Sequence, residues 1–398
     1  MRPAGAPGAS YRGLVAAVEP GFAGLSSLTS AVQGALAASG AGNLGAGVQR
    51  LMTAYRAGEV PAAQVITSQA DAAAYAAYRM PATAAAAAAA LLQMRLALPG
   101  WAPSSMIDFG AGTGGSAWAV ASALPGIEAM TLLEQSAHAI RLGKAIFAGA
   151  ASGSLRSATW RPWRLGGGGS GSGEGGSGPG GSGPGDSGPG DSGPGGGEPT
   201  DSGDFGTADL AVACYVLGEL APTQQAALTM LAARAAPAVL ILEPGTPAGH
   251  RRILAARERL LASGYQIAAP CPHQLGCPLA VEGDWCHFAV RLPRSPIHRQ
   301  AKGAELGYED EKFSYVAAIS RGRVGPDAGG PCPGQPDRLY WPDRPTGRVV
   351  RRPHQRKGLV MLDLCRADGA SSRELVGKSK GEWYRQARKT AWGDRWVP

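Results

Sequence analysis

The chain has 398 residues, enough for two or three domains, and its 44% hydrophobic content suits a globular fold. Its 60 glycines and 31 prolines indicate that part of the length is not folded. The net charge of +8 is uneven, because residues 251–398 hold 26 Lys and Arg against 15 Asp and Glu. This basic half suggests a polyanionic partner, most simply nucleic acid, while a solvated surface would give the same composition. Without a secretory signal or eighteen strongly apolar residues in a row, we expect a cytoplasmic monomer and no membrane partner.

Helical residues dominate the first part of the chain. Ala, Leu, Met and Arg prevail in residues 10–100, and proline is sparse inside the segments. Residues 70–98 are predicted to form one or two helices, interrupted at Pro81. We therefore expect an N-terminal helical region over residues 1–100.

Strands and helices alternate in the next part. Residues 106–109 are predicted to form a strand and residues 117–123 a helix, with a glycine turn between them. A second strand at 131–134 and a helix at 138–148 follow. Such alternation predicts a parallel, doubly wound sheet.

A segment of Gly, Ser, Pro, Asp and Glu interrupts this pattern at residues 166–204. It lacks the apolar side chains needed to offset its ordering entropy, so we expect a disordered insertion in a surface loop. The pattern resumes with a strand at 208–215, a helix at 222–236 and a strand at 238–243. These elements place an α/β domain at residues 101–265.

The glycine turn reads Asp108-Phe-Gly-Ala-Gly-Thr-Gly114, and Glu134 ends the next strand. Glycines let the backbone approach a ligand closely, and an acid at that place accepts hydrogen bonds from ribose hydroxyls. The spacing alone also fits NAD, or a turn with no ligand. The sequence of this turn resembles the first motif of class I methyltransferases, which favours S-adenosylmethionine and a class I, Rossmann-like α/β fold. The cofactor-binding residues expected are Asp108, Gly110, Ala111, Gly112, Gly114 and Glu134.

Residues for methyl transfer are less evident. Cys214 lies in an apolar run at the end of the strand expected at 208–215, where a buried, inert thiol is the favoured interpretation. Glu219 either faces the cofactor or caps a helix. No catalytic residue is therefore predicted.

Three cysteines cluster in the C-terminal region, residues 266–398. Cys271, Cys277 and Cys286 have the spacing C-x5-C-x8-C, and a fourth thiol comes from Cys365 or Cys332. Four thiolates suit either zinc or an iron–sulfur cluster. We prefer Cys365 as the fourth ligand because it ends an expected strand.

These stretches together resemble the mitochondrial and bacterial small-ribosomal-subunit methyltransferase-like family. The similar wording lies at residues 78–83, 108–114, 215–220, 243–247, 271–277, 284–288, 302–315, 358–365 and 383–396. The resemblance implies a [4Fe–4S] cluster held by Cys271, Cys277, Cys286 and Cys365. It also implies a role with the small ribosomal subunit, in its assembly or in modification of its RNA.

Basic blocks at residues 298–302, 348–357 and 378–395 place Lys and Arg beside aromatic residues. Such blocks neutralise phosphates and stack on unpaired bases, which favours binding to small-subunit ribosomal RNA. The favoured function is thus an RNA-binding assembly factor with S-adenosylmethionine-dependent methylation. The alternative is a scaffold that holds an iron–sulfur cluster and binds S-adenosylmethionine without using it.

Overall fold

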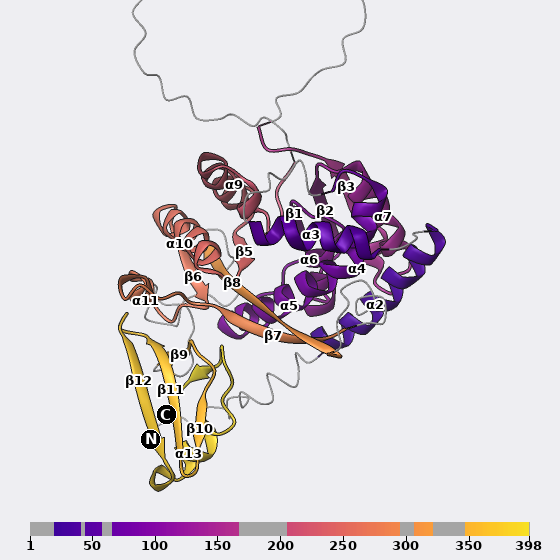
Figure 1. The fold of residues 1–398 in the computed structure, drawn as a ribbon. Coiled ribbons are helices and arrows are strands. Elements are labelled where there is room, and N and C mark those ends of the chain that lie inside the picture. The colour runs from indigo at the N-terminus through magenta and orange to yellow at the C-terminus, as the bar shows by residue number, and fades with distance from the viewer. Residues whose placement is uncertain are drawn as a thin grey trace, which may run out of the picture.

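The computed structural model describes residues 20–40, 44–57, 66–166, 205–294, 306–320 and 347–397. Apart from Gly166, the insertion predicted at 166–204 lies outside these residues, as do Cys332 and the basic block at 298–302. Two sheets organise the described chain, a large one flanked by helices and a small one near the C-terminus (Figure 1).

The large sheet has eight strands in the order β3-β2-β1-β4-β5-β8-β6, with β7 also paired to β8. Strands β1 to β5 are parallel, whereas β8 lies between β5 and β6 and runs antiparallel to both. This order, with one reversed strand next to the edge, is that of the class I methyltransferase fold, so the expected fold class is confirmed. The strands are β1 Ser105–Phe109, β2 Ala129–Glu134, β3 Thr159–Pro162, β4 Leu210–Cys214, β5 Ala238–Pro244, β6 Tyr265–Ala269, β7 Phe288–Pro293 and β8 Tyr308–Ser320.

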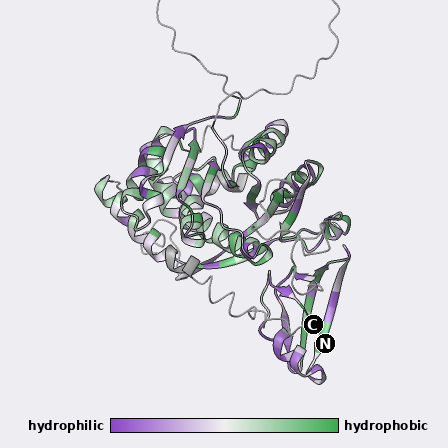
Figure 2. Cartoon of the chain, turned by 180° about the vertical axis from the view of Figure 1, so that it is seen from behind, coloured by the Kyte–Doolittle hydropathy of each residue, from purple (hydrophilic) through white to green (hydrophobic). Residues whose placement is uncertain are grey.

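Helices cover both faces of this sheet because its strands are apolar on both sides. In β1, Met106 belongs to the apolar cluster on one face and Ile107 to the cluster on the other. Figure 2 shows the apolar residues gathered in these strands and in the helices against them. One face carries α9 Pro222–Ala235 and α10 Pro247–Ala262; the other carries α2 Pro20–Ala38, α4 Gln69–Tyr78, α5 Met80–Ala97, α6 Gly115–Ala123 and α7 Ala137–Ala148.

The N-terminal helices form a layer of this unit rather than a separate region. The predicted break falls between Tyr78 and Met80, and Pro81 lies in the first turn of α5, where its missing N–H is tolerated. The alanines of α5 are small, so this helix packs closely on α6 and the sheet. A further helix, α3 Gly45–Ala57, packs on α4. None of the described helices is long and apolar enough to cross a membrane.

The large sheet continues beyond residue 265, where the sequence analysis ended the α/β domain. Strands β7 and β8 extend it to Ser320, and Val239 pairs with Ala318 across this junction. Such pairing joins segments far apart in the chain, so local patterns do not reveal it. The boundary of the large unit therefore lies later than expected.

The small sheet has its own apolar core around Trp396 and Leu362. Its strand order is β10-β11-β9-β13, with β12 paired to β11, and helix α13 packs against β11 and β12. The elements are β9 Gly347–Val349, β10 His354–Arg356, β11 Leu359–Arg366, β12 Ser371–Gly377, α13 Glu382–Ala387 and β13 Arg395–Trp396.

Candidate functional site

The glycine loop joins β1 to α6 and takes a backbone conformation that favours glycine. Gly110, Gly112 and Gly114 have φ angles of +74°, +57° and +93°. A Cβ atom on Gly110 would lie 2.7 Å from Val216 Cγ2, and one on Gly114 would lie 2.5 Å from Phe147 Cζ. Both glycines are therefore packed against neighbouring side chains. A larger residue at either position would clash with them, in addition to adopting an unfavourable φ angle.

Glu134 ends β2 beside this loop. The Gly112 N–H donates to its Oε2 at 2.8 Å and the Ser136 N–H donates to its Oε1 at 2.7 Å. Burial raises the pKa of this carboxyl group, while backbone hydrogen bonds lower it in part. Each carboxylate oxygen keeps a further lone pair that can accept a hydrogen bond from a ligand hydroxyl.

Asp108 lies below the loop and is fully buried. The Ser116 hydroxyl donates to its Oδ2, and its Oδ1 has no partner among the described residues. Burial raises the pKa of Asp108 to about 7. Its geometry supports the loop from beneath.

A cleft of about 610 Å³ opens above the loop, within the size range of small-molecule sites. Of the six predicted cofactor residues, Gly110, Gly112 and Glu134 line it, while Asp108, Ala111 and Gly114 do not. The sequence analysis missed the aromatic lining, which comes from three separate elements and had no local motif. Further lining residues include Tyr75, Trp163, Cys214, Tyr215 and Glu219.

The segment after β4 forms one wall of the cleft. Tyr215 has a φ angle of +61°, unusual for a residue other than glycine. Its hydroxyl donates to Glu311 Oε1 at 2.9 Å, and Arg79 binds the same carboxylate with both terminal nitrogens. Burial raises the pKa of the Cys214 thiol well above its usual value, which suits an unreactive thiol.

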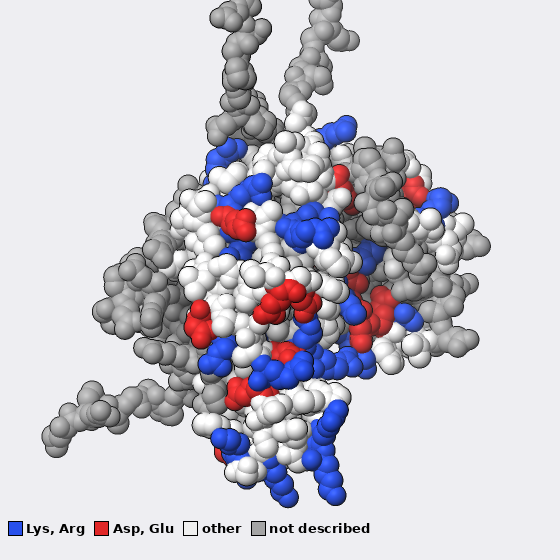
Figure 3. Space-filling view, turned by 60° about the vertical axis from the view of Figure 1, so that its left-hand side comes forward, with Lys and Arg blue, Asp and Glu red and all other residues white. Residues whose placement is uncertain are grey.

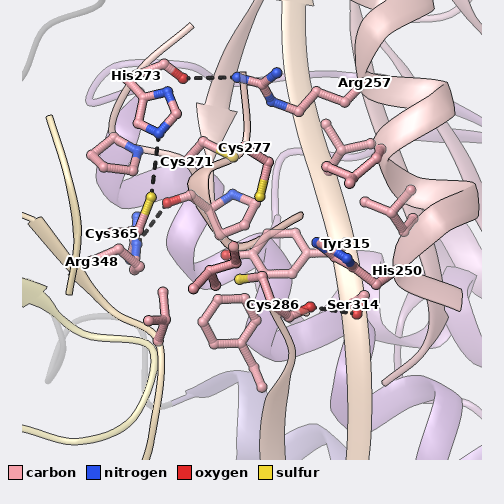
Figure 4. A pocket seen from close by; sticks show the side chains of 18 residues that line it. His250, Arg257, Cys271, His273, Cys277, Cys286, Ser314, Tyr315, Arg348 and Cys365 are labelled. Atoms are coloured by element: carbon pink, nitrogen blue, oxygen red, sulfur yellow. Dashed lines mark hydrogen bonds between the residues drawn. The ribbon is translucent and has the colours of Figure 1, made fainter. Parts of the chain in front are cut away.

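The four cysteines predicted as ligands line one small cavity of about 30 Å³ (Figure 4). Cys271 and Cys277 come from the loop after β6, Cys286 precedes β7, and Cys365 lies near the end of β11 in the small sheet. The cavity thus lies where the two sheets meet. Figure 4 shows the four thiols arranged around its centre.

The thiols are buried and poorly solvated. Burial raises the pKa of Cys271, Cys286 and Cys365, and the neighbouring cysteines raise it further. Among the residues that the structure describes, no three His, Cys, Asp or Glu side chains are grouped as ligands of one metal ion. The four thiols therefore share a cavity without forming a closed cage around one point.

Two buried arginines and a histidine surround these thiols. His273 Nε2 lies 3.3 Å from Cys365 Sγ, and Arg257 Nη2 donates to Leu275 O at 2.7 Å. Arg348, which is 1% exposed, donates from Nε to Pro270 O at 2.8 Å. Buried nitrogen atoms without a partner in the described chain remain on all three side chains: Arg257 Nε, His273 Nδ1 and Arg348 Nη2.

The small sheet carries a strongly basic surface. Residues 347–397 hold thirteen Lys and Arg against five Asp and Glu. The Lys378 N–H donates to Gly358 O at 2.8 Å, which brings two basic turns of the sheet together. In Figure 3, Lys and Arg side chains project from this end of the molecule. We call the following exposed residues the basic end: Arg356, Lys357, Lys378, Lys380, Arg388 and Lys389.

The model of the family described as mitochondrial small ribosomal subunit Rsm22 matches residues 69–167 and 199–397, more than half of the chain. The human ribosome assembly protein METTL17, mitochondrial, is 30% identical over 168 residues, covering 39% of this chain and 32% of that protein. The Rsm22-cox11 tandem protein 2, mitochondrial, of Schizosaccharomyces pombe is 30% identical over 185 residues, covering 39% of this chain and 24% of that protein. The chain thus spans about a quarter to a third of the length of these relatives.

Solved methyltransferase structures are similar at low sequence identity. The mitomycin 7-O-methyltransferase MmcR is 13% identical with a TM-score of 0.37, over 69% of this chain and 67% of that one. The precorrin-6y C5,15-methyltransferase of Geobacter metallireducens is 14% identical with a TM-score of 0.31, over 66% of this chain and 92% of that one. The fold assignment rests on the strand order described above.

The expected cytoplasmic location is wrong. The relatives from human, Schizosaccharomyces pombe and Saccharomyces cerevisiae are all mitochondrial proteins by name. The expectation failed because the cysteine content and apolar pattern of a sequence do not distinguish the cytoplasm from other reducing compartments. On the extent of the family match, this chain belongs to the mitochondrial small ribosomal subunit Rsm22 family.

Proposed function

We propose that this protein is a mitochondrial assembly factor of the small ribosomal subunit that binds ribosomal RNA. The single observation that carries the proposal is the family match, which extends through both the large sheet and the basic small sheet. The relatives named as ribosome assembly proteins support the assembly role.

The cleft is proposed to bind S-adenosylmethionine, which supplies an electrophilic methyl group when bound. Glu134 would accept hydrogen bonds from the ribose hydroxyls. NAD fits less well, because the Gly112 N–H already donates to Glu134 and is not free for a phosphate. A cleft lined by Glu134 and Glu219 also repels a pyrophosphate and suits a cation.

The cysteine cavity is proposed to bind a [4Fe–4S] cluster through Cys271, Cys277, Cys286 and Cys365. In such a cluster each cysteine binds a different iron, so thiols spread around a cavity fit it. The unpartnered nitrogens of Arg257 and Arg348 are suited to the negative charge of the thiolates and inorganic sulfides. The alternative is a single zinc ion, which would need the four thiols to converge on one point.

The basic end is proposed to contact ribosomal RNA. Lys380 lies 5.8 Å from the centre of the Trp383 ring, which is 44% exposed and offers a face for a base. The partners of the six basic residues would be phosphates, which are recognised by charge rather than by sequence.

Whether the bound cofactor is used is tested by comparing two cell lines. Small-subunit RNA modifications are mapped by mass spectrometry in cells that lack the protein and carry either the parent chain or Gly110→Arg, which places a large side chain at a glycine lining the cleft. We expect a methyl group to be restored by the parent and not by the variant. Unchanged modification, with subunit assembly restored by both, would favour the scaffold that binds S-adenosylmethionine without using it.

A further inference from the structure

Two acidic side chains face the cleft from different strands. Glu134 stands at the end of β2 and Glu219 in the 3-10 helix Leu217–Glu219, after β4. Strand β1 and its glycine loop lie between them, because the strand order is β2-β1-β4. A cofactor whose ribose binds Glu134 therefore extends its other end over the loop toward Glu219.

Glu219 has a carboxyl group that is not paired with a cation in the described part of the protein. Its carboxylate has no hydrogen-bond or ion-pair partner among the described residues. Arg252, which lies beside Gly218, is engaged by Glu243 at 2.6 Å. Other charged or titratable groups also line the cleft: Glu134 at the end of β2, Tyr75 from α4, Cys214 at the end of β4, Tyr215 after it, and the exposed Arg164. The balance of these charges in the cleft favours a cationic ligand.

We propose that Glu219 senses the charge on the cofactor sulfur and makes the cleft prefer S-adenosylmethionine to S-adenosylhomocysteine. The inference rests on the proposed cofactor site. The two compounds share their adenosine and amino-acid groups, so Glu134 contributes equally to both. They differ by a methyl group and by the positive charge of the sulfonium, which a thioether lacks. A specificity-determining carboxylate near the sulfur would separate them by about tenfold in affinity.

The preference depends on the proton that Glu219 holds. Burial raises its pKa to about 8, and the charges of Glu134 and Glu243 add to the effect. At pH 7 the free protein therefore keeps Glu219 mostly protonated. A sulfonium favours the ionised form, so S-adenosylmethionine binding releases this proton to the buffer and strengthens as the pH rises toward 9. S-adenosylhomocysteine brings no such charge and releases no proton from this group.

Titration calorimetry on the full chain tests this. Both compounds are titrated at pH 6.5, 7.5 and 8.5, in buffers of different ionisation enthalpy, so that proton release is measured directly. The parent is compared with Glu219→Gln and with Glu128→Gln, an exposed residue at the opposite end of β2. We expect the parent and Glu128→Gln to prefer S-adenosylmethionine about tenfold at pH 8.5 and, as a tenfold coupling implies, to release about half a proton with it at pH 7.5 and less at pH 6.5. Glu219→Gln should lose the preference and the proton release while keeping its affinity for S-adenosylhomocysteine and its melting temperature.

The outcomes separate the inference from the function on which it rests. Equal binding of both compounds to parent and Glu219→Gln would overturn the role of Glu219 and leave the cofactor site standing. Binding of neither compound to the folded parent would overturn the cofactor site itself. If the Glu219→Gln variant lost affinity for both compounds equally, Glu219 would have a general supporting role, which would also overturn the proposal.

Discussion

The cofactor cleft and the cysteine cavity are built from the chain in different ways. The glycine loop and Glu134 belong to one strand–helix–strand unit, β1 to β2, and contact one another directly. The cavity takes thiols from the large unit and one from the small sheet, where Cys365 is 79 residues from Cys286 along the chain. The cleft therefore depends on local turns, whereas the cavity depends on how the two sheets dock.

Loss of a cavity thiol should give the largest effect. Cys277→Ser removes a proposed ligand, and a structural metal site contributes on the order of 10 kcal/mol to folding. We expect the anaerobically purified parent to be brown with about four irons per chain, and the variant to be colourless with an unfolded small sheet. Cys214→Ser, outside the cavity, should keep the iron. Stoichiometric zinc in the parent would contradict the cluster, and equal melting of all three would show that the site is not structural.

Breaking the sheet–sheet contact without touching a thiol should give the next largest effect. Arg348 donates to Pro270 O in the large unit and to Gly393 O, at 2.8 Å each, and also to Gln93. Arg348→Ala should cost about 3–5 kcal/mol, because it leaves three acceptors unpaired at about 1–3 kcal/mol each. Hydrogen exchange should quicken in the small sheet and stay slow in β1 and β4. The matched change Arg352→Ala, at a 71% exposed side chain, should cost under about 0.5 kcal/mol.

Asp108 makes the stability of the cleft region depend on pH. Its pKa in the folded protein, about 7, exceeds the ordinary value of 3.8, so the folded state holds a proton that the unfolded state has lost. The contribution of Asp108 to the free energy of unfolding is therefore greatest below pH 4. Up to about 4 kcal/mol of it is lost as the pH rises through 7. Asp108→Asn keeps an acceptor for Ser116 and should not show this loss. Urea unfolding measures this between pH 4.5 and 8.5. If the unfolding free energies of the parent and of Asp108→Asn changed equally with pH, the raised pKa of Asp108 would be contradicted.

A methyl group in the glycine loop should cost somewhat less. Gly114→Ala places a Cβ atom 2.5 Å from Phe147 and requires a φ angle of +93°, for a loss of about 2–3 kcal/mol in unfolding free energy. Gly264→Ala has a similar φ angle of +83° and open space, so it should cost about 1 kcal/mol. Equal costs would mean that the loop can move away from Phe147. The iron content should be unchanged in both, because the cavity lies elsewhere.

Substitutions in the basic end should give the smallest effect, because neither the cleft nor the cysteine cavity depends on this surface for folding. Lys378→Ala and Lys380→Ala together should weaken RNA binding by about 1–2 kcal/mol and lower the salt dependence by about two counterions. Filter binding at several salt concentrations measures both. Lys144→Ala, an exposed lysine on α7, is the control. An affinity that does not change with salt would argue against phosphate contacts.

The sequence predicted the local parts of both sites better than their surroundings. The glycine turn and Glu134 could be identified because residues near in sequence meet across one turn. The sequence also predicted Cys365 as the fourth ligand, and this residue lies in the same cavity as the three clustered thiols. It placed Arg348 in a basic block expected to bind RNA, whereas this side chain is buried beside the thiols. It did not identify the aromatic lining of the cleft, since a single tyrosine or tryptophan carries no pattern that distinguishes a buried site from a solvated face.

By itself, the sequence determined the alternation of strands and helices, the sharp turn after β1 and the choice of thiols available for a metal. These follow from side-chain periodicity and backbone preference, which act over a few residues. The tertiary structure decided the rest: β8 inserted between β5 and β6, Glu219 brought to face Glu134, and the small sheet docked over three cysteines. Such arrangements depend on burying surfaces that are distant in the chain, and no local pattern encodes that burial.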